Sequence, residues 1–158
     1  MEVRILLCRR VLDRMPEATD AVMGFIQNWL SLRDTKAVVL PQDWDAFVTH
    51  WTSELQEFPE SREPFFAMMR GIITPYRDKY ATEANVEGDG DRVAVADEVE
   101  AMRIITGRHY ATCAYLITDD PTIFQGKRLR LLDSRILTPE LFAAEIQAEE
   151  HTGTRMAG

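Results

Sequence analysis

The sequence predicts an α/β domain of three layers, in which helices cover both faces of a central, mainly parallel sheet of four to five short strands. Two observations predict this class. Short apolar runs rich in branched residues recur along the chain without the polar–apolar alternation of a half-exposed strand. Between them lie longer segments whose apolar residues recur at three- and four-residue spacing, as on one face of a helix. The alternative is an α+β domain in which only the last two strands pair well.

The composition fits one domain. Of the 158 residues, 46% are apolar and 28% charged, which predicts a single domain over 1–150 and a flexible C-terminal tail over 151–158. Cys8 and Cys113 are far apart and belong to no CxxC or Cys/His cluster, so neither a disulfide framework nor a zinc site is indicated. No apolar run is long enough to span a membrane and no signal peptide is recognisable. We therefore expect a cytoplasmic protein with no membrane contact.

The net charge of −8 arises from 18 Lys and Arg against 26 Asp and Glu. Nonspecific binding to nucleic acid depends on clustered cations, so a surface that grips phosphate backbones over its whole extent is not expected. Any contact with nucleic acid must be local.

In the first half of the chain, 3–7 (VRILL) is expected to be a buried strand, and 18–34 follows helical spacing after Pro16. A second strand is expected over 36–40 (KAVVL), closed by Pro41. Asp43 can then cap a helix that carries a stripe of aromatic residues and ends before Pro59. These segments predict a strand, a helix, a second strand and a second helix.

In the second half, 64–73 (PFFAMMRGII) predicts a mostly buried helix that begins at Pro64. A loop over 85–92 and a helix over 94–106 follow, with Gly107 as a candidate C-terminal cap. Strands are expected over 114–118 and 135–137, separated by an acidic turn. Thr138 then caps a last helix, with Pro139 at its first position.

The segments AYLITDD (114–120) and RILTPELFAAEI (135–146) together resemble the closing part of PIN-domain nucleases. In that family a strand ends in a Thr-x-Asp turn, and a later short strand runs into a Thr-Pro-acidic helix. The resemblance covers about a fifth of the chain. It implies a PIN-like scaffold, and an N-terminal apolar strand that delivers the first acid of the active site.

PIN domains hydrolyse phosphodiesters with magnesium or manganese held by three or four carboxylates at the strand ends. The resemblance matches Asp120 to the carboxylate of the Thr-x-Asp turn. Asp45 lies nearest to the family's second acid, and Asp97 to the third, with Glu100 one helical turn later. It thus implies Asp120, Asp97 and Asp45 as catalytic residues, and these three with Glu100 as metal ligands.

Cys8 stands where the family has its first acid, and a thiol is a poor ligand for magnesium. Arg9 and Arg10 add positive charge beside it, which would oppose cation binding if both reach the cleft. The resemblance therefore implies a PIN scaffold with an impaired metal site. In an alternative register Asp13 serves as the first acid, but Arg9 and Arg10 would then lie inside the strand, where burial of charge is costly.

Each candidate also has a purely structural interpretation. The acidic turn is a common turn sequence, Asp45 suits the first turn of a helix, and Asp97 with Glu100 suits a solvated helix face. Cys8 suits a small buried apolar position. These interpretations stay open on the sequence alone.

A second cluster of charge follows the acidic turn, where Lys127 and Arg128 begin the densest basic stretch of the chain. Together with Arg9 and Arg10 they are the candidate substrate-binding residues, because they could contact the phosphates of RNA. A solvated sheet edge is the alternative interpretation.

The resemblance thus implies a relative of metal-dependent ribonucleases, often toxins of toxin–antitoxin pairs, with an impaired or inactive site that binds Mg, Mn or no metal. Its partners would be RNA, a protein or a second copy in a homodimer. The alternatives are a non-catalytic module that binds protein or RNA on the same scaffold, and an unrelated small α/β domain.

Overall fold

The structure, a computed structural model, describes residues 2–17, 19–77 and 90–157, with side chains described over 2–17, 19–77 and 98–150. The strands are β1 (Ile5–Leu7), β2 (Ala37–Val39), β3 (Ile73–Pro75), β4 (Tyr115–Ile117) and β5 (Ile136–Leu137). They form one sheet in the order β3-β2-β1-β4-β5, and every neighbouring pair is parallel. The predicted α/β class is confirmed, and pairing limited to the last two strands is excluded.

The register brings distant parts of the sequence together at the centre of the sheet. Leu6 lies opposite Val38 of β2 on one side and Leu116 of β4 on the other. The Cys8 N–H extends the second pairing by donating to the Ile117 carbonyl at 3.0 Å. The carboxyl ends of β1, β2 and β4 therefore meet at one edge of the sheet.

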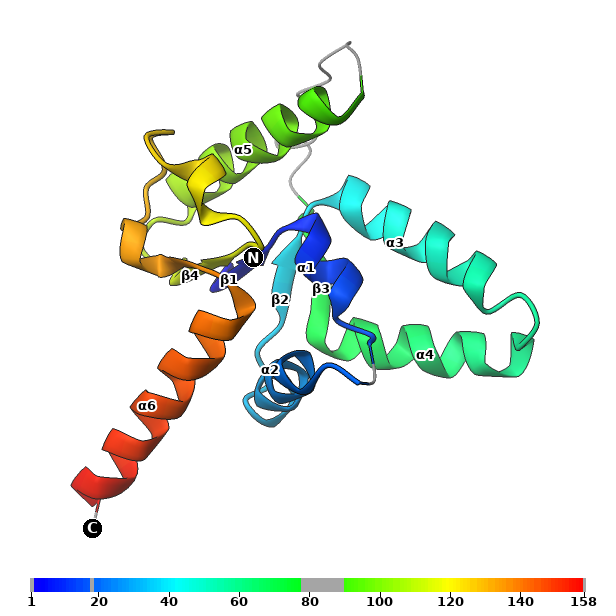
Figure 1. The fold of residues 1–158 in the computed structure, drawn as a ribbon, viewed down its shortest axis with the longest axis horizontal. Helices are drawn as coiled ribbons and strands as arrows, with labels where there is room; N and C mark the ends of the chain where they lie inside the picture. The colour runs from blue at the N-terminus through cyan, green and yellow to red at the C-terminus, as the bar shows by residue number, and fades with distance from the viewer. Residues whose placement is uncertain (1, 18, 78–89, 158) are drawn as a thin grey trace.

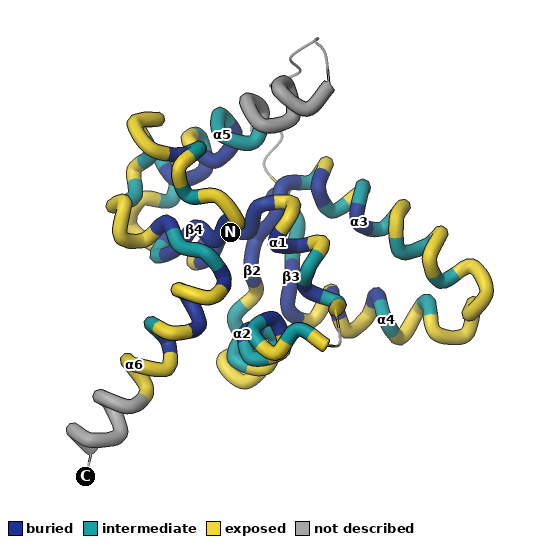
Figure 2. The backbone as a smooth tube through the Cα atoms, viewed as in Figure 1, coloured by how far each residue is buried: buried dark blue, intermediate teal, exposed yellow. Residues whose placement is uncertain are grey.

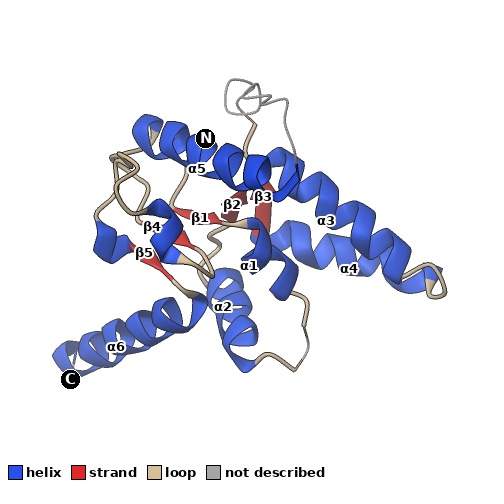
Figure 3. Cartoon of the chain, turned by 45° about the horizontal axis from the view of Figure 1, so that its top comes forward, coloured by secondary structure: helices blue, strands red, loops and turns tan. Residues whose placement is uncertain are grey.

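The described residues contain six α-helices (Figures 1 and 3). They are α1 (Arg9–Arg14), α2 (Ala21–Leu32), α3 (Pro41–Glu54), α4 (Pro59–Ile72), α5 (Gly90–Arg108) and α6 (Pro139–Ala157). Two 3₁₀ turns, η2 (Pro121–Phe124) and η3 (Asp133–Arg135), lie between β4 and β5. Within the described ranges, no helix is both long and apolar enough to cross a bilayer.

Two apolar cores fill the space on the two sides of the sheet, because successive strand residues point to opposite faces. Ile5, Leu7 and Ile117 pack with residues of α1, α2, α3, α4 and α6. Leu6 and Leu116 pack on the other face against α5. The strands β1, β2 and β4 are buried, whereas much of α3 and α4 is exposed (Figure 2). This arrangement is the three-layer α/β/α architecture.

Several element boundaries differ from those expected. The helix α1 and strand β3 were not predicted. Pro41 opens α3 and places Asp43 inside the first turn instead of at the cap. Pro64 lies inside α4, which begins at Pro59.

Toward the C-terminus, α5 runs through Gly107 and ends at Arg108. The Thr138 cap is confirmed, because its Oγ1 accepts from the Leu141 N–H at 3.2 Å. The helix it caps, α6, extends to Ala157 and so includes most of the expected tail. Of the loop expected over 85–92, residues 85–89 lie outside the described ranges, and 90–92 open α5.

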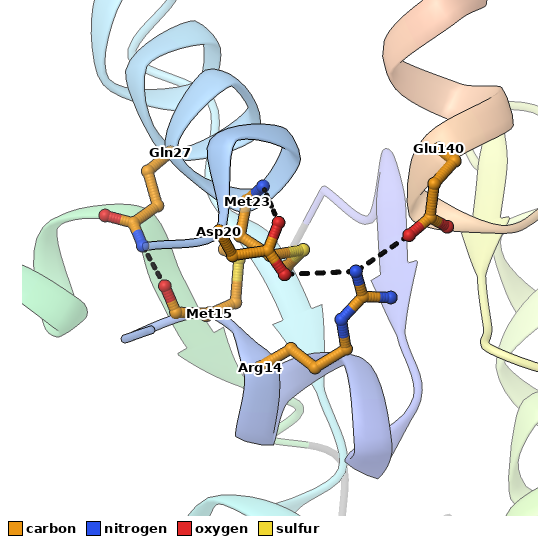
Figure 4. Close-up of polar contacts among 6 residues, drawn as sticks. All are labelled: Arg14, Met15, Asp20, Met23, Gln27 and Glu140. Atoms are coloured by element: carbon orange, nitrogen blue, oxygen red, sulfur yellow. Dashed lines mark hydrogen bonds and ion pairs between the residues drawn. The ribbon is translucent and has the colours of Figure 1, made fainter. Parts of the chain in front are cut away.

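A polar cluster fixes the first helix to two others (Figure 4). The Arg14 guanidinium lies 3.1 Å from an Asp20 carboxylate oxygen and 2.7 Å from one of Glu140. Asp20 also caps α2 by accepting from the Met23 N–H at 3.1 Å, and Gln27 donates to the Met15 carbonyl. Arg14 therefore links α1 to the start of α2 and of α6, which holds α1 against the carboxyl ends of the central strands.

Candidate functional site

Cys8 is the residue that follows β1 at the carboxyl edge of the sheet. Its side chain is 2% exposed and belongs to the core on the α5 side. Burial, and then the charge of Glu98, hold the pKa of the thiol well above its ordinary value, with Glu98 also accepting a hydrogen bond from it. The thiol is thus protonated at neutral pH, which makes Cys8 a poor nucleophile as well as a poor ligand for hard cations.

Asp43 is the buried carboxylate of this edge. It lies in the first turn of α3, directly after β2, and is 6% exposed. Its Oδ2 is buried and has no hydrogen-bond partner among the described residues. Burial, followed by the charge of Glu98, raises the pKa of Asp43 from 3.8 to about 7, although Arg9 partly opposes this rise. An unpartnered buried carboxylate oxygen is costly, and a buried acid with a strongly raised pKa is a candidate for a functional site.

Glu98 approaches the same edge from α5 on the other face of the sheet. Its side chain is half-buried. Burial raises the pKa of Glu98, and the negative charge of Asp119 raises it further. The hydrogen bond from Cys8 lowers this pKa, as do the positive charges of Arg10 and Arg9. Two carboxylates with raised pKa values, delivered by α3 and α5, therefore interact around Cys8.

The turn after β4 brings two further acids with different roles. The Asp119 carboxylate lies 3.3 Å from Arg10 and acts on Glu98. Asp119 and Asp120 are both exposed. Asp120 caps η2, because its Oδ1 accepts from the Thr122 N–H at 3.2 Å and from the Thr122 hydroxyl. Its own N–H donates to the buried Thr118 Oγ1 at 3.2 Å. The acid of this turn that faces the edge is therefore Asp119.

The other predicted acids lie on α3 and α5. Asp45 is exposed on α3, two residues beyond Asp43. Asp97 lies in α5, and its side chain is outside the described ranges. Glu100 is paired with Arg103 one turn along α5, which lowers the pKa of Glu100. The structure thus does not gather Asp45, Glu100 and Asp120 into one site.

Asp43 and Glu98 are the acids that the sequence analysis missed, each by one or two positions. Helical spacing could have found both. Asp43 precedes the buried Phe47 by four residues, and Glu98 precedes the buried Met102 by four. Residues four apart share a helix face, so both acids point toward the core side of their helices.

The four basic residues predicted to bind substrate lie in two separate parts of the structure. Arg9 and Arg10 are exposed in the first turn of α1 and act on the carboxylates of the edge. The alternative register therefore does not hold, since β1 ends at Leu7 and both arginines follow the strand. Lys127 and Arg128 lie instead in the connection from β4 to β5. That connection is bonded to α5 near its far end, where the Arg130 N–H donates to Thr106 Oγ1 at 3.4 Å.

Asp43, Glu98 and Cys8, with Asp119 held by Arg10, form what we term the acidic edge. Among the side chains that the structure describes, no three His, Cys, Asp or Glu residues converge into a group that could hold a metal ion by themselves. Asp43 and Glu98 nonetheless offer the hard oxygen donors that Mg or Mn needs. Magnesium is commonly held by one or two carboxylates together with water and substrate phosphate. The donor set thus fits a weak, substrate-assisted cation site and not a closed cage.

Comparison of the chain with protein-family models, with curated proteins and with solved structures finds no match.

Proposed function

We propose that this chain is a PIN-like protein related to metal-dependent ribonucleases of the toxin–antitoxin type, whose acidic edge binds divalent cations weakly and cleaves RNA poorly or not at all. The observation that carries the proposal is the buried Asp43 carboxylate, which has an unpartnered oxygen and interacts with Glu98. A parallel sheet that places β1 beside β4 supports the scaffold, because ligands of such sheets bind at the carboxyl ends of the strands.

The proposed roles follow from the chemistry of the edge. Asp43 and Glu98 would hold Mg or Mn, and Arg9 and Arg10 would contact the phosphate on the open side. When bound, the cation supplies a Lewis acid that neutralises charge on the phosphodiester. Asp43 has a pKa of about 7, so a proton competes with the cation for this carboxylate near neutral pH. Cation binding therefore releases protons and becomes tighter as the pH rises.

Two features explain why the activity would be weak. Cys8 supplies no oxygen donor at the end of the central strand, where the resemblance implies an acid. Asp119 already neutralises part of the charge of Arg10. Neither Cys8 nor Asp119 therefore offers an unpaired carboxylate to a cation, and the positive charge of the neighbouring Arg9 opposes cation binding.

The same two features favour a second candidate function, a non-catalytic module that binds RNA or protein on this scaffold. In this alternative Asp119 stays paired with Arg10, and Asp43 takes up no cation. The two candidates differ in whether the edge takes up a cation.

The test combines calorimetric titration of the protein with manganese and a cleavage assay on labelled RNA. Asp43→Asn is compared with Asp45→Asn, a matched control that removes the same charge from the exposed side of the same helix turn. Asp120→Asn is the third variant, because the resemblance gives that residue a catalytic role. We expect millimolar manganese binding that Asp43→Asn abolishes and the two other variants keep. Absence of manganese binding to the wild type at millimolar concentration would exclude the enzyme and leave the binding module.

A further inference from the structure

A groove lined by arginines lies apart from the acidic edge, at the C-terminal end of α5. A hollow of about 580 Å³ lies between the last turns of α5 and the connection from β4 to β5. Arg103 and Arg108 line it from the helix, and Arg128 and Arg130 from the connection. A second hollow of about 310 Å³ shares Arg130 and Tyr110 with the first and extends it to Arg135. We term the two together the arginine groove.

The lining of the groove carries one sign of charge. Five arginines contribute to it, and among the side chains that the structure describes no Asp or Glu lines either hollow. Glu100 pairs with Arg103 beside the groove, and the Arg135 guanidinium lies over the ring of Tyr115. On a chain with a net charge of −8, such a concentration of arginine creates a local positive potential. Arginine clusters of this kind bind phosphate groups, often with two hydrogen bonds to each guanidinium.

Two large apolar side chains are exposed to solvent beside these arginines. Tyr110 is 71% exposed and lines both hollows, and Leu132 is 72% exposed in the second. An exposed aromatic ring between arginines is the arrangement on which unpaired bases stack while the phosphates are neutralised. A purely acidic peptide would use the arginines and leave the ring without a partner.

The backbone of the groove is held in an uncommon conformation. Arg128 has φ = +56°, in the left-handed region that favours glycine. Its neighbour Arg130 is anchored to α5, where its N–H donates to Thr106 and its Cγ lies against Gly107. A long charged residue kept at a position suited to glycine costs stability, and such strain is found most often at binding sites.

From these observations we propose that the arginine groove binds single-stranded nucleic acid, with phosphates on the arginines and a base stacked on Tyr110. Duplexes present no unstacked base to the ring, so they would bind more weakly. The proposal does not depend on cation binding at the acidic edge, since its residues lie in the last turns of α5, between α5 and β4, or in the β4–β5 connection.

The test is fluorescence anisotropy of a labelled oligouridine about a dozen nucleotides long, in EDTA, at two salt concentrations. EDTA removes any contribution of the acidic edge, so failure of the cation site leaves this result unaffected. We expect binding that weakens as salt rises, because phosphate contacts release counterions. An oligothymidine of the same length, the corresponding duplex and an oligoglutamate of equal charge serve as competitors. The thymidine strand should compete like the uridine strand, and the duplex and the peptide should compete at least about tenfold less well.

Arg128→Gly separates binding from folding. Removing the side chain should lower affinity about tenfold and reduce the salt slope by about 0.7, the value for one phosphate contact on a single strand. The same change should keep or raise the melting temperature, because glycine suits the left-handed backbone. Arg70→Ala is the matched control, since it removes an exposed arginine of α4 that is paired with Glu63. Tyr110→Ala should also lower affinity about tenfold, with little change in the salt slope.

Three results would overturn the proposal. These are no binding by the wild type at low salt, equal affinities for Arg128→Gly and Arg70→Ala, and competition by oligoglutamate as strong as by the oligonucleotides. The last result would identify the groove as a site for an acidic protein.

Discussion

Asp43→Asn tests whether the acidic edge holds a carboxylate that resists ionisation. Asp43 is 6% exposed, and its pKa is about 7 in the folded chain against an ordinary 3.8. Because the folded pKa is the higher one, this group favours folding most at low pH. That contribution is lost as the pH rises from about 4 through 7. Asparagine has almost the same shape and no charge, so the variant does not carry this cost.

The magnitude follows from the two pKa values. At about 1.4 kcal/mol for each pH unit between them, the ionised Asp43 costs the folded chain about 4 kcal/mol in full. Linkage places about 2 to 3 kcal/mol of this between about pH 5 and pH 8. Between about pH 5 and pH 8, the free energy of unfolding of Asp43→Asn relative to that of the wild type should therefore rise by about 2 to 3 kcal/mol. For a chain of this length, the gain corresponds to about 5 to 10 °C in melting temperature.

The assay is urea unfolding at both pH values in EDTA, with wild type, Asp43→Asn and the exposed control Asp45→Asn. EDTA is needed because a bound cation would stabilise the ionised form. Asp45→Asn should follow the wild type at both pH values. If the free energy of unfolding of Asp43→Asn relative to the wild type rises by less than about 0.5 kcal/mol between the two pH values, the pKa of Asp43 is not raised by burial. The proposed function would then lose the observation that carries it.

Three further predictions concern other contacts. Arg14→Met should lower stability by about 1 to 2 kcal/mol at neutral pH in urea unfolding, because it leaves Asp20 and Glu140 without their shared partner. That deficit should shrink in acid. The Met23 N–H and then Arg14 lower the pKa of Asp20, and Arg14 lowers the pKa of Glu140, so the contribution of the two ion pairs is lost as the pH falls through those values. A deficit independent of pH would contradict this. Without metal, Cys8→Asp should melt at a lower temperature than the wild type, because it adds an acid beside Asp43 and Glu98, whose pKa values are already raised. Millimolar manganese should raise the melting temperature of this variant more than that of the wild type. Equal shifts would argue against a cation site. Thr138→Ala should cost about 1 kcal/mol by removing the cap of α6, with Thr138→Ser retaining most of the stability, and an equal loss in both variants would show that the hydroxyl is not the cause.

The sheet could be predicted from the sequence because its strands are buried on both faces. Runs such as 36–40 and 114–118 are apolar without alternation, and that pattern is specific to strands covered on both sides. Strand β3 escaped prediction because its three residues end in Pro75 and follow α4 without a break. Helix α1 escaped because it has only six residues, and two charged ones open it.

The candidate site could be predicted only to within a few residues. The sequence placed acids at the carboxyl ends of the strands and identified Cys8 and the arginines beside it. It took Pro41 as the end of a strand, whereas Pro41 opens α3 and turns Asp43 inward. It also selected Asp120 within the acidic turn, where the choice between neighbours depends on which carboxylate caps η2. Such choices follow from tertiary contacts, which one sequence does not encode as a pattern.

The central claim is that Asp43 and Glu98 form a weak cation site at the carboxyl edge of the sheet. Nuclear magnetic resonance with manganese tests it most directly, because the paramagnetic ion broadens backbone amide signals close to where it binds. We expect substoichiometric manganese to broaden Cys8, Asp43, Glu98 and Asp119 first, and Asp43→Asn to remove this broadening. Broadening that persists unchanged in Asp43→Asn but is removed by Asp45→Asn would contradict the claim.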